Sequence, residues 1–141
     1  MKVKTYRDPL LLAIDVTQQR SKALVLWEME KKKQEHSSLV KNIPSLPAQV
    51  IMDELNDLVE LGLVARIVHV RRKPQKIEYA LTNRGAQLLK CLRKMMNVGI
   101  EIMMDFGMND YLEKEGYIEK VPVDDLDTTD PNEQVEMRIK S

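Results

Sequence analysis

The chain has 141 residues, 4% of them aromatic and nine of them methionine, which suits a single domain with a modest aliphatic core. Its formal net charge is zero, yet residues 1–104 hold 18 Lys and Arg against 11 Asp and Glu, whereas residues 105–141 hold 4 against 11. A basic body with an acidic tail favours an anionic partner for the body. One cysteine excludes an intramolecular disulfide, and no stretch resembles a secretion signal or a membrane span. We therefore expect a cytoplasmic protein without a membrane partner.

The first third of the chain predicts short helices. Residues 1–8 are polar, and we expect them to be flexible. Helices are predicted over Pro9–Gln18, Lys22–Lys33 and a short segment that Pro44 ends. Ser21 and Ser37 are expected to cap the second and third of these helices, because a serine hydroxyl can accept from a free backbone N–H. The run Lys31–Lys33 either ends a solvated helix or contacts phosphate.

A fourth helix is predicted over Pro47–Leu61. Its apolar positions recur every three or four residues and form one stripe, namely Ile51, Leu55, Leu58 and Leu61. Pro47 suits the first turn of a helix, and Gly62 can end it in the left-handed conformation. A short helix, a tight turn and an amphipathic helix predict a helix-turn-helix.

A β-hairpin is predicted directly after this helix. Leu63–Val70 is β-branched and largely apolar, and Lys76–Leu81 alternates polar and apolar residues. Between them lies a charged turn over residues 71–75. We therefore predict a mainly α fold with a small β-hairpin wing, which is a winged helix-turn-helix with flanking dimerisation helices.

After the hairpin, Thr82 is expected to cap a long helix with a wide apolar stripe. This stripe either covers the winged helix of its own chain or, as we prefer, forms a dimer interface against a symmetry mate. The stripe residues predicted for that interface are Leu88, Leu92, Met95 and Met96. A last helix is predicted to end near Lys114. Residues 9–117 would form the winged-helix and dimerisation domain, and residues 118–141 a disordered acidic tail.

From Pro9 to Gly99 the chain resembles the HxlR-type winged-helix transcriptional regulators of bacteria, relatives of the MarR group. The residues that carry the resemblance are Lys22, Trp27, Ser37-x-Leu39, Pro44, Leu55-x-x-Leu58-x-x-x-Gly62-Leu63-Val64-x-Arg66 and Pro74-x-Lys76-Ile77-Glu78-Tyr79-Ala80-Leu81-Thr82-x-x-Gly85. The resemblance implies a homodimer, built through the first and last helices of the domain, that binds near-palindromic operator DNA. It therefore adds Leu10, Leu11 and Ile14 of the first helix to the predicted dimer interface.

Two departures from the family limit what the resemblance implies. Family members usually place a cysteine before the first proline, and some use it to sense oxidants or aldehydes, but this chain has Asp8 there. Cys91 lies near Leu88 on the apolar side of its predicted helix, so we expect a buried structural thiol and not a sensor. The recognition helix also differs, with Pro47, Gln49 and Met52 where the family often has Ser, Lys and Thr, so the operator and the effector are not transferred.

The outward face of the fourth helix supplies the predicted base contacts. The residues expected there are Gln49, Met52, Asp53 and Asn56. Glutamine and asparagine suit adenine, and a methionine can touch a thymine methyl group. The carboxylates of Asp53, Glu54, Asp57 and Glu60 oppose this role, since phosphate repels them. We therefore expect the helix to enter DNA by its N-terminal turn, where the helix dipole favours phosphate.

The wing is expected to supply most of the affinity. The predicted contacts are Arg71, Arg72, Lys73 and Lys76, with Lys41 from the third helix. Such cations can neutralise phosphates or place an arginine in the minor groove. The alternative is a hairpin tip that is merely solvated.

The sequence thus predicts a sequence-specific, DNA-binding transcriptional regulator that acts as a homodimer on double-stranded DNA. The alternative is a winged-helix module that binds proteins and not DNA, and a third possibility is an acidic tail that competes with DNA for the basic body. No catalytic constellation, cofactor loop or metal site is recognised, and His36 and His69 lack neighbouring ligands. An unidentified small-molecule effector would be sought near Trp27 and Met95.

Overall fold

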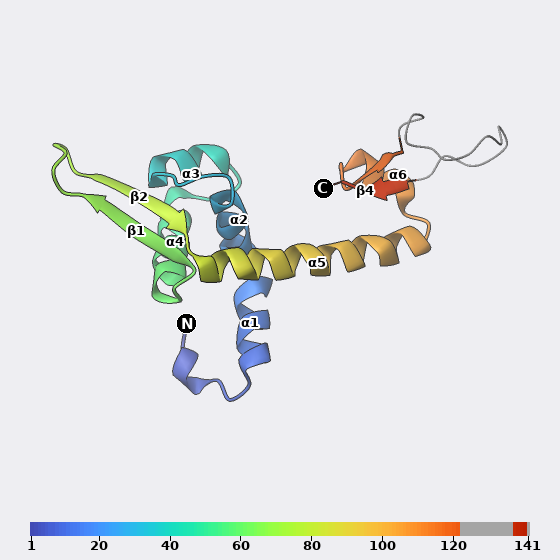
Figure 1. Ribbon diagram of the computed structural model, residues 1–141, viewed down its shortest axis with the longest axis horizontal. Helices are drawn as coiled ribbons and strands as arrows, with labels where there is room; N and C mark the ends of the chain where they lie inside the picture. The colour runs from blue at the N-terminus through green and yellow to red at the C-terminus, as the bar shows by residue number, and fades with distance from the viewer. Residues whose placement is uncertain (122–136, 141) are drawn as a thin grey trace. The chain divides into compact units, whose positions relative to one another are not determined.

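The computed structural model describes residues 1–121 and 137–140, which fall into two compact units, Met1–Leu92 and Arg93–Ser141. The first unit contains η1 (Val3–Thr5), α1 (Pro9–Gln18), α2 (Arg20–Met29), α3 (His36–Asn42), α4 (Ala48–Glu60), β1 (Val64–His69), β2 (Lys76–Leu81) and the start of α5 (Asn83–Asp105). The second contains the end of α5, α6 (Asn109–Lys114), β3 (Ile118–Lys120) and β4 (Met137–Ile139). The predicted mainly helical fold with one hairpin wing is confirmed (Figure 1).

The core of the first unit lies on the apolar stripe of α4. Ile51, Leu55 and Leu58 are fully buried, as their spacing predicts. They pack where α4 meets α2, α3 and β1. Each such side chain stabilises the fold by about 2 kcal/mol relative to remaining exposed. Packing on three elements therefore fixes which face of α4 points outward.

Two predicted helix caps are wrong. The second helix begins at Arg20, so Ser21 lies inside it, and its hydroxyl donates to Glu54 Oε1 at 3.2 Å. The third begins at His36 after Glu35, which makes no side-chain cap, so Ser37 also lies inside a helix. The second helix also ends at Met29, before the lysine run. Serine inside a first turn finds other partners, which sequence spacing alone cannot distinguish from a cap.

At the starts of α1 and α5, a side-chain oxygen caps the free backbone N–H groups. Asp8 caps α1, because its Oδ1 accepts from Leu10 N at 2.9 Å and from Leu11 N at 3.3 Å. Thr82 caps α5 as predicted, since its Oγ1 accepts from Gly85 N at 3.1 Å and donates to Gly62 O at 2.7 Å. Val3–Thr5 forms a short 3-10 helix within the segment that was predicted to be flexible.

The hairpin is an antiparallel pair whose register runs from Val64↔Leu81 to His69↔Lys76. Its base is held by Gln34, between α2 and α3. The two backbones exchange hydrogen bonds there, Gln34 N to Tyr79 O at 2.9 Å and Tyr79 N to Gln34 O at 2.8 Å. The Gln34 side chain donates to Glu28 O and accepts from Asn42 Nδ2. The hairpin therefore extends from the helices on a fixed base (Figure 1).

Two glycines allow α4, the wing and α5 to meet closely. Gly62 ends α4 with a φ of +72°, a conformation that other residues rarely adopt. A Cβ at Gly85 would lie 2.2 Å from the carbonyl oxygen of Leu63. The start of α5 therefore packs directly on the backbone at the base of the wing.

In the second unit, β3 and β4 pair antiparallel from Ile118↔Ile139 to Lys120↔Met137. Ile100, Leu112 and Ile118 form its buried core. Ile118–Lys120 and Met137–Ile139 therefore depart from the disordered tail predicted over residues 118–141, because apolar residues at both ends of that segment pair. Residues 122–136, most of the acidic segment proposed to compete with DNA, lie outside the described residues. Within the described parts, no helix is both long and apolar enough to cross a membrane.

Candidate nucleic-acid interface

The outward face of α4 presents the predicted polar residues unequally. Gln49, Asp53 and Asn56 are exposed, and Gln49 Nε2 donates to Asp53 Oδ1 at 3.0 Å. Met52 is only half-buried, and its sulfur accepts a 3.9 Å hydrogen bond from the hydroxyl of Tyr79. Met52 therefore contacts the base of the wing with part of its side chain. Gln49, Asp53 and Asn56 expose hydrogen-bonding groups that a partner could use.

The acidic character of α4 is partly offset from inside the protein. Lys22 of α2 is 1% exposed, and its Nζ lies 2.7 Å from Glu54 Oε2 and 3.0 Å from Asp57 Oδ2. Burial would lower the pKa of Lys22, but its hydrogen bonds to Glu54 and Asp57, with their charges, outweigh burial and raise it. The charged lysine therefore offsets one of the two negative charges of these carboxylates at neutral pH.

Asp53 and Glu60 are the exposed carboxylates of α4. The predicted conflict between an acidic helix and phosphate is thus reduced by one charge but not removed. The sequence analysis did not predict that Lys22 pairs with Glu54 and Asp57, because these residues are more than thirty positions from it. One signal was present in the sequence: Lys22 lies three, four and seven positions before Val25, Leu26 and Met29, so it shares the face of α2 that is buried.

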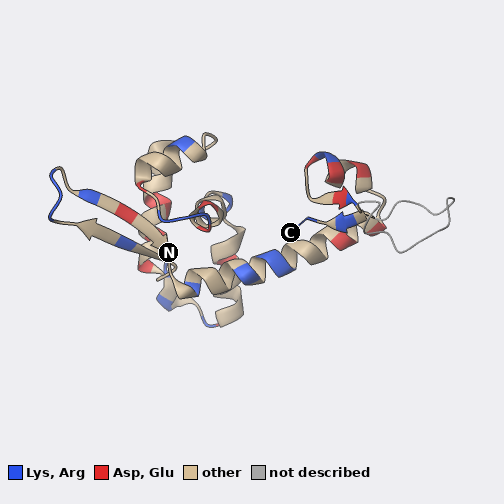
Figure 2. Cartoon of the chain, turned by 45° about the horizontal axis from the view of Figure 1, so that its top comes forward, with Lys and Arg blue, Asp and Glu red and all other residues tan. Residues whose placement is uncertain are grey.

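The wing tip carries three positive charges that are uncompensated within the described part of the chain. Arg71, Arg72 and Lys73 are exposed in the turn between β1 and β2, where Figure 2 shows a positively charged tip. Their side chains have no hydrogen-bond or ion-pair partner among the described residues. The structure therefore brings these three predicted cations together at one exposed point.

The other two predicted cations lie apart from the tip. Lys41 is exposed on α3. Lys76 is half-buried at the start of β2, with its Nζ 3.7 Å from Glu35 Oε1 and 3.9 Å from Glu78 Oε1. Because two carboxylates attract Lys76, it offers less free charge to a phosphate than the tip does.

A polar cluster near the wing tip involves Glu78. His69 Nε2 lies 2.7 Å from Glu78 Oε1 across the hairpin. Burial would raise the pKa of Glu78, but the hydrogen bond from His69 and the charges of Lys76 and Lys33 outweigh burial and lower it. His69, predicted to be an ordinary sheet residue, thus helps to hold a carboxylate that orders Lys76.

The predicted dimer residues are divided between the two units. Leu10, Leu11 and Ile14 of α1 are 68%, 49% and 42% exposed in the first unit. Leu88 and Leu92 are half-buried against the core of that unit, whereas Met95 and Met96 are exposed in the second. The first helix therefore displays an apolar face that its own unit leaves uncovered.

The prediction for Cys91 needs correction. Cys91 is exposed, not buried, because Leu88, Leu89 and Leu92 form the stripe of α5 that turns inward and residue 91 lies beside it. Trp27 lies in the first unit and Met95 in the second, and the effector site expected near them stays a prediction. A cavity of about 870 Å³ lies elsewhere in the first unit, bordered by η1, α1, the end of α4 and the start of α5.

Comparisons with known proteins agree with this architecture. The family model described as HxlR-like helix-turn-helix matches residues 16–106. The uncharacterized HTH-type transcriptional regulator YvaP of Bacillus subtilis (strain 168) is 31% identical over 80 residues, which cover 57% of this chain and 73% of that protein.

Solved structures show the same fold. A putative MarR-family transcriptional regulator from Enterococcus faecalis V583 superposes with a TM-score of 0.66 at 21% identity, covering 73% of this chain and 96% of that one. The reduced form of the regulator YodB from B. subtilis gives 0.59 at 21% identity, covering 64% and 89%. The family match favours the predicted DNA-binding regulator over an interaction module that does not bind DNA. The chain belongs to the HxlR-like helix-turn-helix family and is a DNA-binding transcriptional regulator.

Proposed function

We propose that the protein binds near-palindromic operator DNA as a homodimer, with the N-terminal half of α4 in the major groove and the wing tip on the flanking backbone. The observation that carries this proposal is the Lys22 network. It draws the carboxylates of Glu54 and Asp57 toward the protein, while Gln49 and Asp53 stay exposed in the first half of α4.

Base reading falls to three side chains of α4. Gln49 and Asn56 each offer a donor and an acceptor, the pattern that adenine presents in the major groove. Asp53 can accept from the amino group of cytosine. The hydrogen bond between Gln49 and Asp53 holds both side chains in the same region of the exposed face. Sequence preference would therefore depend most on these two residues.

Affinity falls mainly to the wing. Arg71, Arg72 and Lys73 have no competing carboxylate partner among the described residues, so binding a phosphate breaks no internal ion pair. Each neutralised phosphate releases counterions and steepens the dependence of affinity on salt. Lys41 adds a second positive position beside the helix-turn-helix. These contacts would orient the protein on the duplex without reading its sequence.

Dimerisation follows from the uncovered face of α1. Leu10, Leu11 and Ile14 recur at helical spacing and are all exposed. Burying such a face against a symmetry mate removes its apolar area from water. A two-fold dimer would place the recognition helices about 34 Å apart, one turn of duplex, and would require matching half-sites.

The test measures oligomeric state and footprint on the full-length protein. Sedimentation should show a dimer, and selection from random DNA followed by hydroxyl-radical footprinting should reveal two related half-sites about 10 base pairs apart. Leu10→Glu with Leu11→Glu should yield a monomer with weakened DNA binding, whereas Tyr117→Glu, a matched exposed position, should not. A monomeric wild type, or a single asymmetric footprint, would refute the proposed assembly.

A further inference from the structure

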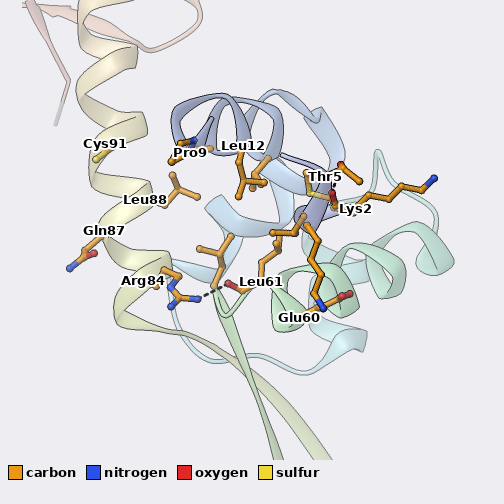
Figure 3. A pocket seen from close by; sticks show the side chains of 16 residues that line it. Lys2, Thr5, Pro9, Leu12, Glu60, Leu61, Arg84, Gln87, Leu88 and Cys91 are labelled. Atoms are coloured by element: carbon orange, nitrogen blue, oxygen red, sulfur yellow. Dashed lines mark hydrogen bonds between the residues drawn. The ribbon is translucent and has the colours of Figure 1, made fainter. Parts of the chain in front are cut away.

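The cavity of the first unit has the size and lining of a small-molecule site. Its volume of about 870 Å³ falls within the range of ligand pockets, roughly 300–1,000 Å³. Figure 3 shows its walls, which come from the N-terminal segment, α1, the end of α4 and the start of α5. Its floor is the core itself, since Val16 and Leu63 are 5% exposed. Partly buried apolar residues extend that floor, namely Met1, Leu12, Leu61 and Leu88.

The charged groups around the cavity favour an anionic ligand. Lys2, Lys4 and Arg84 line it, against a single carboxylate from Glu60. An apolar interior with a surplus of cations suits a molecule that has an apolar body and a negative end. A neutral apolar molecule would contact the apolar floor but would give these cations no anionic partner.

Arg84 is the cation that the structure positions most firmly. Its Nη1 donates to the backbone oxygen of Leu61 at 3.0 Å, the contact drawn in Figure 3. The guanidinium lies over Gly62, where an added Cβ would come within 2.6 Å of Nη1. Within the described chain, no other protein group accepts from this guanidinium. Its remaining N–H groups are therefore available for a carboxylate, which matches a guanidinium well in geometry.

We propose that this cavity binds a small amphipathic carboxylate, with its apolar body on the core floor and its carboxylate on Arg84, and that occupancy changes the affinity for operator DNA. The second part rests on the proposed function. The end of the recognition helix lies at the cavity through Glu60 and Leu61, and the proposed dimer helix α1 lies there through Leu12 and Ala13. A ligand between them alters how the DNA-reading helix packs on the dimerising helix.

The first experiment measures binding without DNA. Isothermal titration of the full-length protein with octanoate and with octanamide separates the charged end from the apolar body. Octanoate should bind at least about tenfold more tightly, the worth of a charge-assisted contact. Arg84→Gln should remove that difference, whereas Lys90→Gln, which removes an exposed charge from the same helix outside the cavity, should retain it. Ala13→Trp, which fills the cavity, should abolish binding of both compounds.

Equal binding of the two compounds to the wild type would overturn the carboxylate site, and so would an unchanged preference in Arg84→Gln. Sedimentation of Ala13→Trp tests whether the cavity is instead filled by a second copy of the chain: loss of the dimer, with no octanoate binding in the wild type, would overturn the proposal. Both readouts hold even if the protein binds no operator.

The second experiment asks whether occupancy matters. Saturating octanoate should change the DNA affinity of the wild type and leave that of Ala13→Trp unchanged. Octanoate binding with no change in DNA affinity would overturn the regulatory part and leave the site itself intact. Absence of DNA binding in every sample would instead count against the proposed function, whereas the titration would still decide the cavity.

Discussion

The helix α4 and the wing tip are both assigned to the DNA-facing side, yet they handle charge in opposite ways. The helix has four carboxylates and no basic residue, and two of its carboxylates are bound from within by Lys22. The tip has three adjacent cations with no internal partner among the described residues. In the helix, two carboxylates that would repel phosphate are paired with a buried lysine. In the wing, the cations that would attract phosphate are exposed to solvent.

This difference separates stability from affinity. Removing a cation that is buried beneath α4 leaves carboxylates without a partner inside the protein, so the folded state suffers first. Removing a cation from the solvated tip leaves nothing unsatisfied in the fold, so only DNA binding suffers. Variants beneath α4 should therefore lower the stability of the fold, whereas variants at the wing tip should lower only the affinity for DNA.

The largest expected effect follows from Lys22→Met. It should lower the free energy of unfolding by about 3 kcal/mol, because Glu54, whose side chain is only 14% exposed, would lose its charged partner and Asp57 would lose the same one. Lys31→Met is the matched control, since Lys31 also pairs with a glutamate at 3.0 Å but is 68% exposed. The control should cost less than about 0.5 kcal/mol. Urea denaturation measures both, and equal effects would contradict the assigned role of Lys22.

The next effect concerns the junction between α4 and the wing. Gly85→Ala should destabilise the protein by about 2 kcal/mol, because the new Cβ would meet the Leu63 carbonyl oxygen and push α5 from the base of the wing. Gly99→Ala places the same methyl group in the same helix with nothing within 4 Å. It should stabilise by about 0.5 kcal/mol, since alanine favours helix. Thermal unfolding measures the change in stability of both variants. Changes of the same sign would contradict the close approach of Gly85 to the Leu63 carbonyl oxygen.

A smaller effect tests which part of α4 reads bases. Gln49→Ala should weaken binding to the selected operator by roughly 1–2 kcal/mol and relax its sequence preference. Asn56→Ala, two turns further along the helix, should have the smaller effect if the helix enters by its N-terminal half. Fluorescence anisotropy on the operator and on base-substituted operators compares them. A larger loss in Asn56→Ala would place the C-terminal half of α4 in the groove instead.

The smallest effect is a pH dependence at the wing. The pKa of Glu78 is lowered in the folded protein, so its contribution to stability is present above the ordinary carboxyl pKa near 4.5 and is lost as the pH falls through the lowered value. Glu78→Gln removes the titrating group. The urea midpoint should therefore fall less in the variant than in the wild type between about pH 6 and about pH 3. An identical fall would show that Glu78 makes no such contribution.

Much of the fold was predictable because local signals agreed with one another. The stripe on α4, the positive φ of Gly62, the two strands of the hairpin and the Thr82 cap all follow from residue type and spacing. These features depend on neighbours within a few positions. The exposed cations of the tip were predictable for the same reason, since a charged turn between two strands projects into solvent.

The parts that could not be predicted depend on residues far apart in the chain. Ser21 matches a cap in the sequence but instead donates to Glu54, which a distant helix brings near it. Cys91 is exposed because helix phase, and not composition, decides which side of α5 turns inward. The pairing of β3 with β4 joins segments on either side of residues 122–136. Such contacts join residues that are far apart in the sequence, so local patterns cannot predict them before the tertiary structure is known.

Whether the wing binds DNA is decided by the salt dependence of DNA binding in the double variant Arg71→Ala with Arg72→Ala. We expect weaker binding to operator and random DNA alike, a log–log salt slope that is shallower by about 2, and unchanged stability. Lys114→Ala with Lys120→Ala, which removes two charges from the second unit, should leave the slope as in the wild type. An unchanged affinity and slope in the wing variant would contradict the assignment of the wing to DNA.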